Sequence, residues 1–406
     1  MPTLPAPPEP PLSPFRQTLR FAKDPFAFLA DTRAQCGEIF ALNILGMGRC
    51  VFLCRVEHLS ELYRMPEEKV VAGEIRKRLL AYLFGPRASI SLDGEEYAQR
   101  RRTIQPFFSG RRVLQHTGLI VQQTQDRIAG FPVDQPFALQ PHLNQVSLYV
   151  ASRILFGPLD QEPAQQIVPL AGDFLSALQP PAVQNKLLQW NLPWTPFGRF
   201  VGARQKLAEA VSTAVRAQQQ RNHSAEEPAE DVLSALVDAK LYDDEDICRD
   251  AIVHELVALV VGGAETTGKV LAWTLHGVLS QPEVKDRLRQ EIDNELGEKP
   301  IESSDLRQLP YLHAVIQEGM RFQSAGPFAG PRLTKQAIEI GDYTIPADTI
   351  IAQCLQEAGR NELFPNPEVF DPQNFLDSGV KTRDWAPFGG GSRMCTGMGL
   401  AQLELA

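Results

Sequence analysis

The chain has 406 residues, of which 43% are hydrophobic and 22% are charged, a balance typical of a globular protein that can bury a sizeable core. The formal net charge of -9 argues against a nucleic-acid partner, because such proteins present a strongly basic surface. The sequence shows no signal peptide and no apolar run of the roughly 18 residues that a membrane span needs. We therefore expect a cytoplasmic protein without a membrane anchor.

The six cysteines are scattered along the chain. Cys50 and Cys54 are the only close pair, and no second pair or neighbouring histidine completes a zinc site. Every cysteine except Cys395 is interpreted as a small buried hydrophobic residue in a reducing compartment.

The N-terminal segment 1–14 carries seven prolines and is expected to be an extended leader before a single domain, 15–406. Residues 25–36 predict an amphipathic helix that Gly37 ends. Two strands are then expected, at 38–44 and 49–53, because the glycines between them are typical of a hairpin. A further helix follows at 58–65.

The pattern between residues 67 and 91 is irregular. Residues 93–108 return to a helical pattern and contain three consecutive arginines. For Arg100 and Arg102 we favour a solvated basic face or a docking surface for an acidic protein. Helical patterns continue through 126–128 and 143–155.

Residues 170–201 are rich in Leu, Trp, Pro and Phe. Trp194 and Phe197 lie in a proline-interrupted stretch and are expected either to be buried in the core or to belong to an apolar lid. Residues 226–231 predict an exposed acidic loop.

A long apolar segment, 247–279, follows four acidic residues, and carboxylates are favoured at the N-terminus of a helix. Its residues would span roughly 50 Å as a helix, so it is expected to run through the core. Gly262 and Gly263 in its middle each cost about 1 kcal/mol relative to alanine, which a flat group approaching the backbone would offset. Thr266 beside Glu265 offers a hydroxyl relay next to an acid.

Residues 282–296 predict a charged surface helix, and 309–322 predict another. Glu318 and Arg321 in the latter lie at i and i+3 and can pair on one face. Strands are expected at 337–341 and 349–352.

Residues 388–397 read Phe-Gly-Gly-Gly-Ser-Arg-Met-Cys-Thr-Gly. The glycines let the backbone pass close to a flat, bulky group, and they tolerate positive φ. Cys395 projects from this turn with N–H donors nearby that can stabilise a thiolate. Arg393 supplies a fixed positive charge for an anionic group.

This stretch resembles the haem-thiolate signature of the cytochrome P450 superfamily, Phe-x-x-Gly-x-Arg-x-Cys-x-Gly. All five fixed positions are present, at Phe388, Gly391, Arg393, Cys395 and Gly397. Residues 261–267 match the family's Ala/Gly-Gly-x-Asp/Glu-Thr-Thr/Ser pattern, and the Glu318–Arg321 pair follows in the family's order. The resemblance covers nearly all of the chain and is closest to the soluble bacterial style.

The resemblance implies a mainly α fold with a small β region, wrapped around one haem b, with the long helix crossing over the haem. It implies that Cys395 binds the iron, that Thr266 holds a proton-delivering water network, and that Glu265 passes protons inward. It implies that segment 67–91 forms a loop over the substrate and that segment 170–201 covers the substrate channel. The residues that would bind the cofactor are Tyr97, Arg101, Arg332, Phe388, Arg393, Cys395 and Gly397.

The expected activity is that of a monooxygenase, which inserts one oxygen atom of O2 into an apolar small molecule by hydroxylation or epoxidation. The apolar 170–201 segment leans towards a fatty acid or an isoprenoid. Electrons would come from a separate ferredoxin- or flavodoxin-type donor with its reductase. The alternatives are a peroxide-driven peroxygenase, and a non-catalytic or truncated haem-binding protein.

The sequence departs from the family pattern at several positions. Tyr97 stands where Trp or His is usual, Asn374 replaces an arginine that would join the Glu318–Arg321 network, and Gly359-Arg360-Asn361 replaces His-Arg-Asp. The chain stops at Ala406, eleven residues after Cys395, and we therefore expect that it lacks the family's C-terminal segment.

Overall fold

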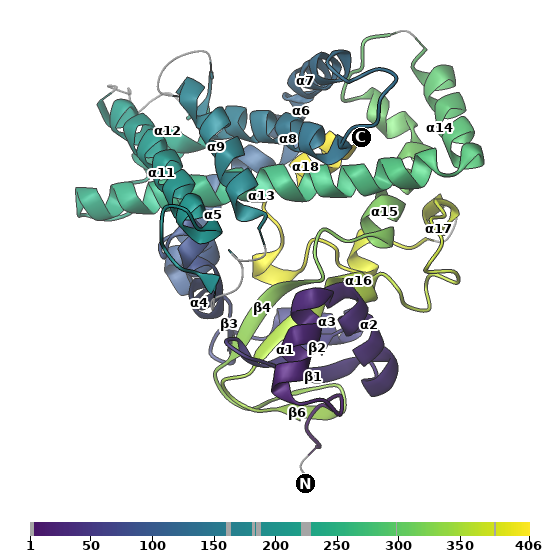
Figure 1. The fold of residues 1–406 in the computed structure, drawn as a ribbon. Coiled ribbons are helices and arrows are strands. Elements are labelled where there is room, and N and C mark those ends of the chain that lie inside the picture. Colours follow the sequence, from purple (N-terminus) through teal and green to yellow (C-terminus); the bar gives the residue numbers. More distant parts are fainter. Residues whose placement is uncertain are drawn as a thin grey trace.

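The computed structural model describes residues 4–406 except 160–163, 181–182, 184–187, 221–228, 298 and 377–378. A large helical part, crossed from side to side by α13, lies above a smaller β region that also holds the N-terminus (Figure 1). The predicted fold class, mainly α with a small β region, is confirmed.

The α-helices of the described residues are α1 (Pro14–Lys23), α2 (Pro25–Cys36), α3 (Val56–Arg64), α4 (Gly73–Phe84), α5 (Gly94–Ile104), α6 (Gly110–Leu114), α7 (Thr117–Ala129), α8 (Leu139–Phe156), α9 (Ala164–Leu178), α11 (Pro196–Gln220), α12 (Val232–Asp238), α13 (Glu245–Leu279), α14 (Pro282–Glu295), α15 (Pro310–Phe322), α16 (Leu355–Ala358), α17 (Gln373–Leu376) and α18 (Met398–Leu405). The strands are β1 (Ile39–Ile44), β2 (Gly48–Leu53), β3 (Val70–Val71), β4 (Phe328–Thr334), β5 (Ile338–Ile340), β6 (Tyr343–Ile345) and β7 (Ile350–Cys354). Short 3₁₀ helices include η1 (Ser89–Ser91), η2 (Gln105–Phe108) and η6 (Gly391–Arg393).

The long helix predicted at 247–279 is α13, which has 35 residues and begins two residues earlier. The Asp244 carboxylate caps it by accepting a hydrogen bond from the Ile247 N–H at 2.8 Å. Its buried residues lie all around the helix, as expected for a helix that packs on several sides. The helices α8, α11 and α15 pack against it. Residues of α8 and α11 form the main core with α13, whereas α15 belongs to a second core that includes Val270 of α13.

The β region contains a five-stranded sheet in the order β1-β2-β7-β4-β3 and a two-stranded sheet of β5 and β6. β1 and β2 form the predicted hairpin, and β2 runs parallel to β7. The proline-rich segment lies across both sheets, because Pro8 accepts a hydrogen bond from Ala41 at 2.8 Å and Pro5 accepts one from Thr344 at 2.9 Å.

The loop predicted at 67–91 is wrong, since most of this segment forms β3, α4 and η1. Helix α4 is capped from outside its own sequence. The Asp93 carboxylate accepts hydrogen bonds from the N–H groups of Ala72, Gly73 and Glu74 at 2.7–3.0 Å. A local reading misses such a start signal, because the capping residue follows the first residue of the helix by 20 residues.

The solvated or docking role expected of Arg100 is also wrong, whereas Arg102 is exposed and pairs with Glu95. Arg100 is 2% exposed and its Nη1 lies 3.1 Å from Oε2 of Glu255, which is 1% exposed. Glu255 also accepts hydrogen bonds from the N–H and hydroxyl of Ser89, at 2.6 and 2.7 Å. Arg100 is therefore a core ion-pair residue that joins α5 to α13.

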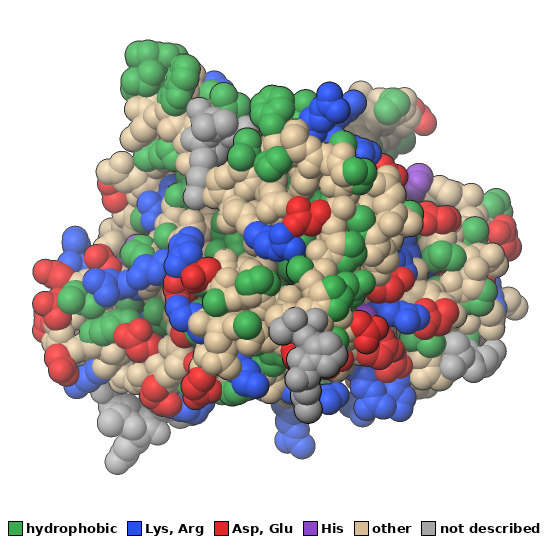
Figure 2. All heavy atoms as spheres, turned by 90° about the horizontal axis from the view of Figure 1, so that it is seen from below, with side chains coloured by type: hydrophobic (Ala, Val, Ile, Leu, Met, Phe, Trp, Pro, Cys, Tyr) green, Lys and Arg blue, Asp and Glu red, His purple; other side chains and the backbone are tan. Residues whose placement is uncertain are grey.

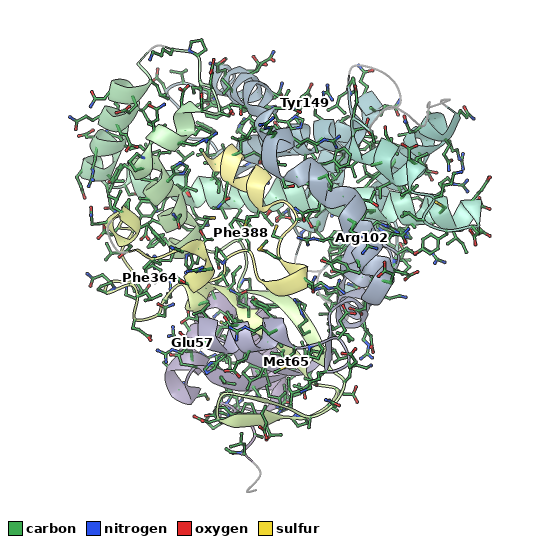
Figure 3. All side chains as sticks on the ribbon, turned by 180° about the vertical axis from the view of Figure 1, so that it is seen from behind. Glu57, Met65, Arg102, Tyr149, Phe364 and Phe388 are labelled. Atoms are coloured by element: carbon green, nitrogen blue, oxygen red, sulfur yellow. The ribbon has the colours of Figure 1, made fainter. Side chains whose placement is uncertain are left out.

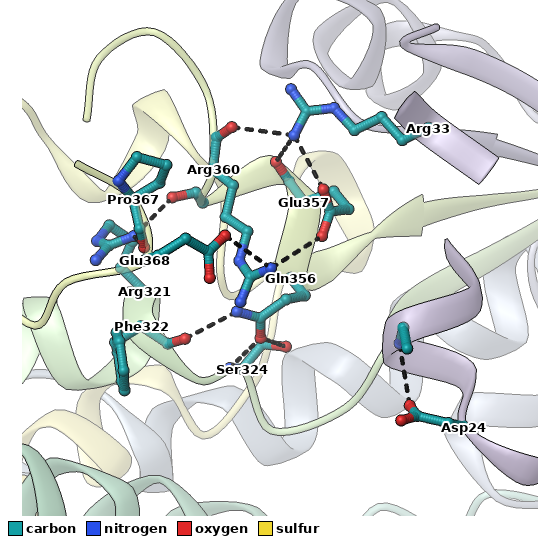
Figure 4. Close-up of polar contacts among 12 residues, drawn as sticks. Asp24, Arg33, Arg321, Phe322, Ser324, Gln356, Glu357, Arg360, Pro367 and Glu368 are labelled. Carbon is teal, nitrogen blue, oxygen red and sulfur yellow. Dashed lines mark hydrogen bonds and ion pairs between the residues drawn. The ribbon is translucent and has the colours of Figure 1, made fainter. Parts of the chain in front are cut away.

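The Glu318–Arg321 pair is completely buried, with Nη2 and Oε1 2.6 Å apart. Arg321 also donates to the carbonyl oxygens of Gly359 and Pro367, at 3.1 and 2.9 Å, and so fastens the segment after α16 to α15 (Figure 4). The Asn374 amide donates to Oε2 of Glu318 at 3.4 Å, so it joins the network without a charge.

The predicted segment 170–201 falls on α9, a described loop at 188–195 and the start of α11, with 181–182 and 184–187 outside the described residues. Phe197 packs on the buried Phe200, whereas Trp194 is 74% exposed. Residues 226–228 of the predicted acidic loop also lie outside the described residues. Asp231 caps α12 by accepting from the Ser234 N–H at 2.7 Å.

The surface seen from below carries acidic and basic side chains side by side, with hydrophobic groups scattered between them (Figure 2). Within the described ranges, no helix combines the length and the apolar character that crossing a membrane requires.

Candidate functional site

The glycine-rich turn before α18 is built closely against α3. A Cβ at Gly390 would lie 2.4 Å from Cδ2 of Tyr63, and one at Gly391 would lie 2.6 Å from the Tyr63 carbonyl oxygen. Gly391 also has a φ of 64°, which other residues rarely adopt. The Cys395 N–H donates to the Phe388 carbonyl at 2.9 Å and closes the turn. Phe388 lies near the middle of the view from behind (Figure 3).

Cys395 keeps a solvent-accessible surface, although protein atoms crowd its sulfur. This burial raises the pKa of the Cys395 thiol, while a hydrogen bond from the Gly397 N–H and the charge of Arg101 act in the opposite direction. These two groups would favour the thiolate once a cation or metal compensates for the burial.

Tyr97 and Arg101, on α5, brace the same turn. The Tyr97 hydroxyl donates to the Ser392 carbonyl at 2.7 Å. Nη1 of Arg101 donates to the Tyr97 hydroxyl oxygen at 3.1 Å and to the Met394 carbonyl at 2.6 Å. Tyr97 and Arg101, which were both predicted to bind the cofactor, therefore contact the backbone of the cysteine turn in this structure.

Arg393, in the same turn, is held by Asp93 and Tyr97. Its Nη2 donates to the Asp93 carboxylate at 2.7 Å, and its guanidinium carbon lies 3.4 Å from the centre of the Tyr97 ring. Its Nη1 is buried and has no hydrogen-bond partner. Since Asp93 also caps α4, the signature arginine is tied directly to that helix.

Arg76, on α4, and Arg332, on β4, complete a cluster with Arg393. A Cβ at Gly330 would lie 3.8 Å from Nη1 of Arg332 and 4.0 Å from Nη2 of Arg76. Burial, and then the charges of Arg332 and Arg393, lower the pKa of Arg76 to about 9. The buried Nε of Arg76 has no hydrogen-bond partner.

The three guanidinium groups of Arg76, Arg332 and Arg393 form what we call the arginine cluster. Buried N–H groups without partners are costly, and so is a local excess of positive charge. An anionic group with several oxygens would satisfy both, and the two propionates of a haem have this character. The arginine cluster therefore fits the predicted cofactor. Sequence reasoning missed Arg76, because it lies in the segment that was read as a loop.

The middle of α13 exposes one short face. Gly262 and Thr266 are exposed, whereas Val261, Ala264 and Thr267 are buried. A Cβ at Gly262 would meet nothing within 4 Å, but one at Gly263 would lie 3.0 Å from Cβ of Ala151. Gly263 is thus needed for packing on α8, while Gly262 leaves room on the open face.

Thr266 and Glu265 differ in their contacts. The Thr266 hydroxyl donates to the Gly262 carbonyl one turn earlier, at 2.8 Å. Oε1 of Glu265 lies 3.3 Å from Nε2 of Gln179 and 3.6 Å from Nζ of Lys269. The turn that carries Cys395 passes directly below the middle of α13 (Figure 1). Helix α18, which directly follows this turn, packs against α13.

A groove of about 470 Å³ lies between α3 and the cysteine turn. Its lining combines apolar side chains with two arginines: Tyr63, Arg64, Arg383, Phe388, Met394 and Met398 are among the residues. The groove therefore offers a mixed apolar and basic surface beside the cysteine turn.

Known proteins that resemble this chain identify its family. The cytochrome P450 family profile matches residues 5–406. "Putative cytochrome P450 138" of Mycobacterium tuberculosis is 30% identical over 376 residues, which cover 91% of this chain and 80% of that protein. "Putative cytochrome P450 135B1" of the same species is 26% identical and covers 98% of this chain and 82% of its own length.

Among solved structures, the retinoic acid-bound cyanobacterial CYP120A1 superposes with a TM-score of 0.81 at 25% identity, covering 99% of this chain and 90% of that one. This likeness confirms the predicted fold. On the family match and the curated relatives together, the chain belongs to the cytochrome P450 family, whose members are monooxygenases that bind haem through a cysteine thiolate.

Proposed function

We propose that this protein binds haem b through Cys395 and inserts one atom of O2 into an apolar small molecule. The observation that carries the proposal is the pairing of an accessible cysteine, which receives a hydrogen bond from Gly397, with the arginine cluster. A thiolate ligand and an anion site are the two anchors that a haem needs.

Haem, when bound, supplies the iron that activates dioxygen, and a thiolate ligand favours O–O cleavage. Cys395 would hold the iron as a thiolate after losing its thiol proton to solvent, and the Gly397 N–H and Arg101 would stabilise the charge on its sulfur. Tyr97 and Arg101 hold the turn through its carbonyl groups and so orient the sulfur.

The residues of the arginine cluster would bind the propionates with charge-assisted hydrogen bonds. Thr266 presents its hydroxyl on the open face of α13, where it would hold a water molecule and pass on a proton. Glu265 would exchange that proton with solvent. Phe388 and Gly397 belong to the turn that holds Cys395.

For the substrate, we propose a lipid-like molecule such as a fatty acid or an isoprenoid. The CYP120A1 structure has retinoic acid bound, which is a largely apolar isoprenoid acid. The apolar α9–α11 segment supports the same class, because apolar walls favour apolar ligands.

For the electron supply, we propose a separate ferredoxin- or flavodoxin-type protein with its reductase. The groove beside the cysteine turn would receive it, with Arg64 and Arg383 attracting an acidic partner. Turnover with peroxide but none with a reductase would instead favour a peroxygenase.

The first test is the carbon monoxide difference spectrum of the reduced, haem-loaded protein. We expect the long-wavelength Soret band of a thiolate-ligated complex in the wild type and in the control Cys36→Ser, and its loss in Cys395→Ser. A band that persists in Cys395→Ser would refute the assignment of the ligand. Haem binding without this band in the wild type would favour a non-catalytic haem protein.

A further inference from the structure

The cysteine turn is preceded by a residue with an unusual backbone conformation. Ala386 has a φ of 50°, in the left-handed region that residues other than glycine rarely adopt. It also directly precedes Pro387, and a residue before proline normally takes an extended conformation. Because Ala386 is buried, its carbonyl group needs partners within the protein. Neighbouring groups must therefore hold this strained conformation in place.

Gln353, on strand β7, supplies one of these groups. Its Nε2 donates a hydrogen bond to the Ala386 carbonyl oxygen at 2.9 Å. The same carbonyl oxygen accepts the Gly389 N–H at 3.0 Å. Gln353 is 1% exposed, and β7 is paired on both sides, with β2 and with β4. The sheet thus presents a fixed donor to the residue from which the turn starts.

Tyr63, on α3, fixes the orientation of the Gln353 amide. Its hydroxyl donates to Oε1 of Gln353 at 2.8 Å, which leaves Nε2 as the atom that faces Ala386. The Tyr63 ring is itself held in place, since the guanidinium carbon of Arg332 lies 5.8 Å from its centre and Gly390 packs closely against it. Burial raises the pKa of Tyr63 to about 12, so its hydroxyl keeps its proton and remains a donor at neutral pH.

We propose that Tyr63 and Gln353 are positioning residues for the cysteine turn, which act through Ala386. The proposal rests on the ligand role proposed above for Cys395. The Tyr63 hydroxyl orients the Gln353 amide, and the amide holds the Ala386 carbonyl and with it the strained backbone. The Cys395 N–H is bonded to the carbonyl of Phe388, two residues after Ala386, so a displaced Ala386 moves the backbone that supports the cysteine.

The strain at Ala386 separates this role from a merely structural one. Glycine adopts a positive φ without strain, so Ala386→Gly should make the turn largely independent of Gln353. Gln356 is the matched control, because it is also a buried glutamine with several hydrogen bonds. Its bonds go to Ser324 and to the Phe322 carbonyl rather than to the cysteine turn (Figure 4).

The first measurement is hydrogen–deuterium exchange of residues 388–395 in the full chain without haem, with α8 as the internal reference. Gln353→Leu should speed exchange there about fivefold, which corresponds to about 1 kcal/mol. Gln353→Leu/Ala386→Gly should exchange within about twofold of Ala386→Gly alone. Tyr63→Phe should speed exchange about twofold, and adding it to Gln353→Leu should give no further increase. Gln356→Leu should match the wild type.

Two outcomes of this measurement would overturn the proposal. One is exchange at the wild-type rate in Gln353→Leu. The other is an equal acceleration by Gln353→Leu with and without Ala386→Gly, because the strain would then play no part. If Gln353→Leu does not fold, the milder Tyr63→Phe, with and without Ala386→Gly, decides in the same way.

The second measurement is the carbon monoxide difference spectrum of the reduced, haem-loaded variants. Gln353→Leu should lose at least half of the long-wavelength Soret band, since the displaced sulfur no longer binds as a thiolate. Adding Ala386→Gly should restore the band, and Gln356→Leu should keep it in full.

A full band in Gln353→Leu would contradict the positioning role. Absence of the band in the wild type would instead refute the ligand role of Cys395, and the exchange rates without haem would still decide whether Tyr63 and Gln353 hold the turn.

Discussion

Removing a charge from the arginine cluster should stabilise the haem-free protein and weaken its binding of haem. An ordinary arginine has a pKa above about 12, and each pKa unit corresponds to about 1.36 kcal/mol. Because the pKa of Arg76 is lowered to about 9, its charged form is destabilised on folding by up to about 4 kcal/mol at neutral pH. Without an anion, Arg76 therefore opposes folding.

We expect Arg76→Met to raise the unfolding free energy of the haem-free protein by about 2 to 4 kcal/mol, since methionine keeps an apolar stem without the buried charge. The same substitution should weaken haem binding. A hydrogen bond to a charged group contributes about 1.5 to 3 kcal/mol, which corresponds to roughly a 10- to 100-fold loss of affinity.

The assay combines urea unfolding of the haem-free protein with haem titration followed at the Soret band. Arg78→Met is the matched control, because Arg78 lies on the same helix but is exposed and pairs with Glu74 at the surface. It should change both quantities little. A less stable haem-free Arg76→Met protein, or one with unchanged haem affinity, would refute the assignment of Arg76 to an anion site.

Three further outcomes are expected. Arg100→Met should lower the free energy of unfolding, measured in urea, by about 3 to 5 kcal/mol, because it leaves Glu255 buried without its cation. The double variant Arg100→Met/Glu255→Leu should recover most of that loss. Equal losses in the two proteins would contradict the pairing. Burial lowers the pKa of His254 to about 4. Because an unfolded histidine binds a proton already below about pH 6.5, lowering the pH favours the unfolded state. The free energy of unfolding should therefore fall by about 2 kcal/mol between pH 7 and 4.5. His254→Gln should flatten that dependence in urea titrations, and an unchanged slope would exclude His254 as its source. Thr266→Ala should lower the product formed per NADPH on a panel of fatty acids and retinoids, and unchanged coupling would rule out its proton-transfer role.

The sequence alone determined the family and the order of its main elements. Both the cysteine signature and the apolar run that forms α13 are patterns among neighbouring residues, so they can be read directly from the sequence. The signature consists of Phe388, Gly391, Arg393, Cys395 and Gly397. The hairpin of β1 and β2 and the helices α2, α14 and α15 were predictable for the same reason.

Only the tertiary structure decided which charged residues belong together. Arg100 was read as exposed because its run of arginines carries no local sign of Glu255, which follows 155 residues later. Helix α4 was missed because Asp93 caps it from beyond its own end, and Arg76 was lost with it. The contact of Gln179 with Glu265 likewise spans 86 residues. Burial and pairing depend on which distant segments the fold brings together, and periodicity along the chain does not contain that information.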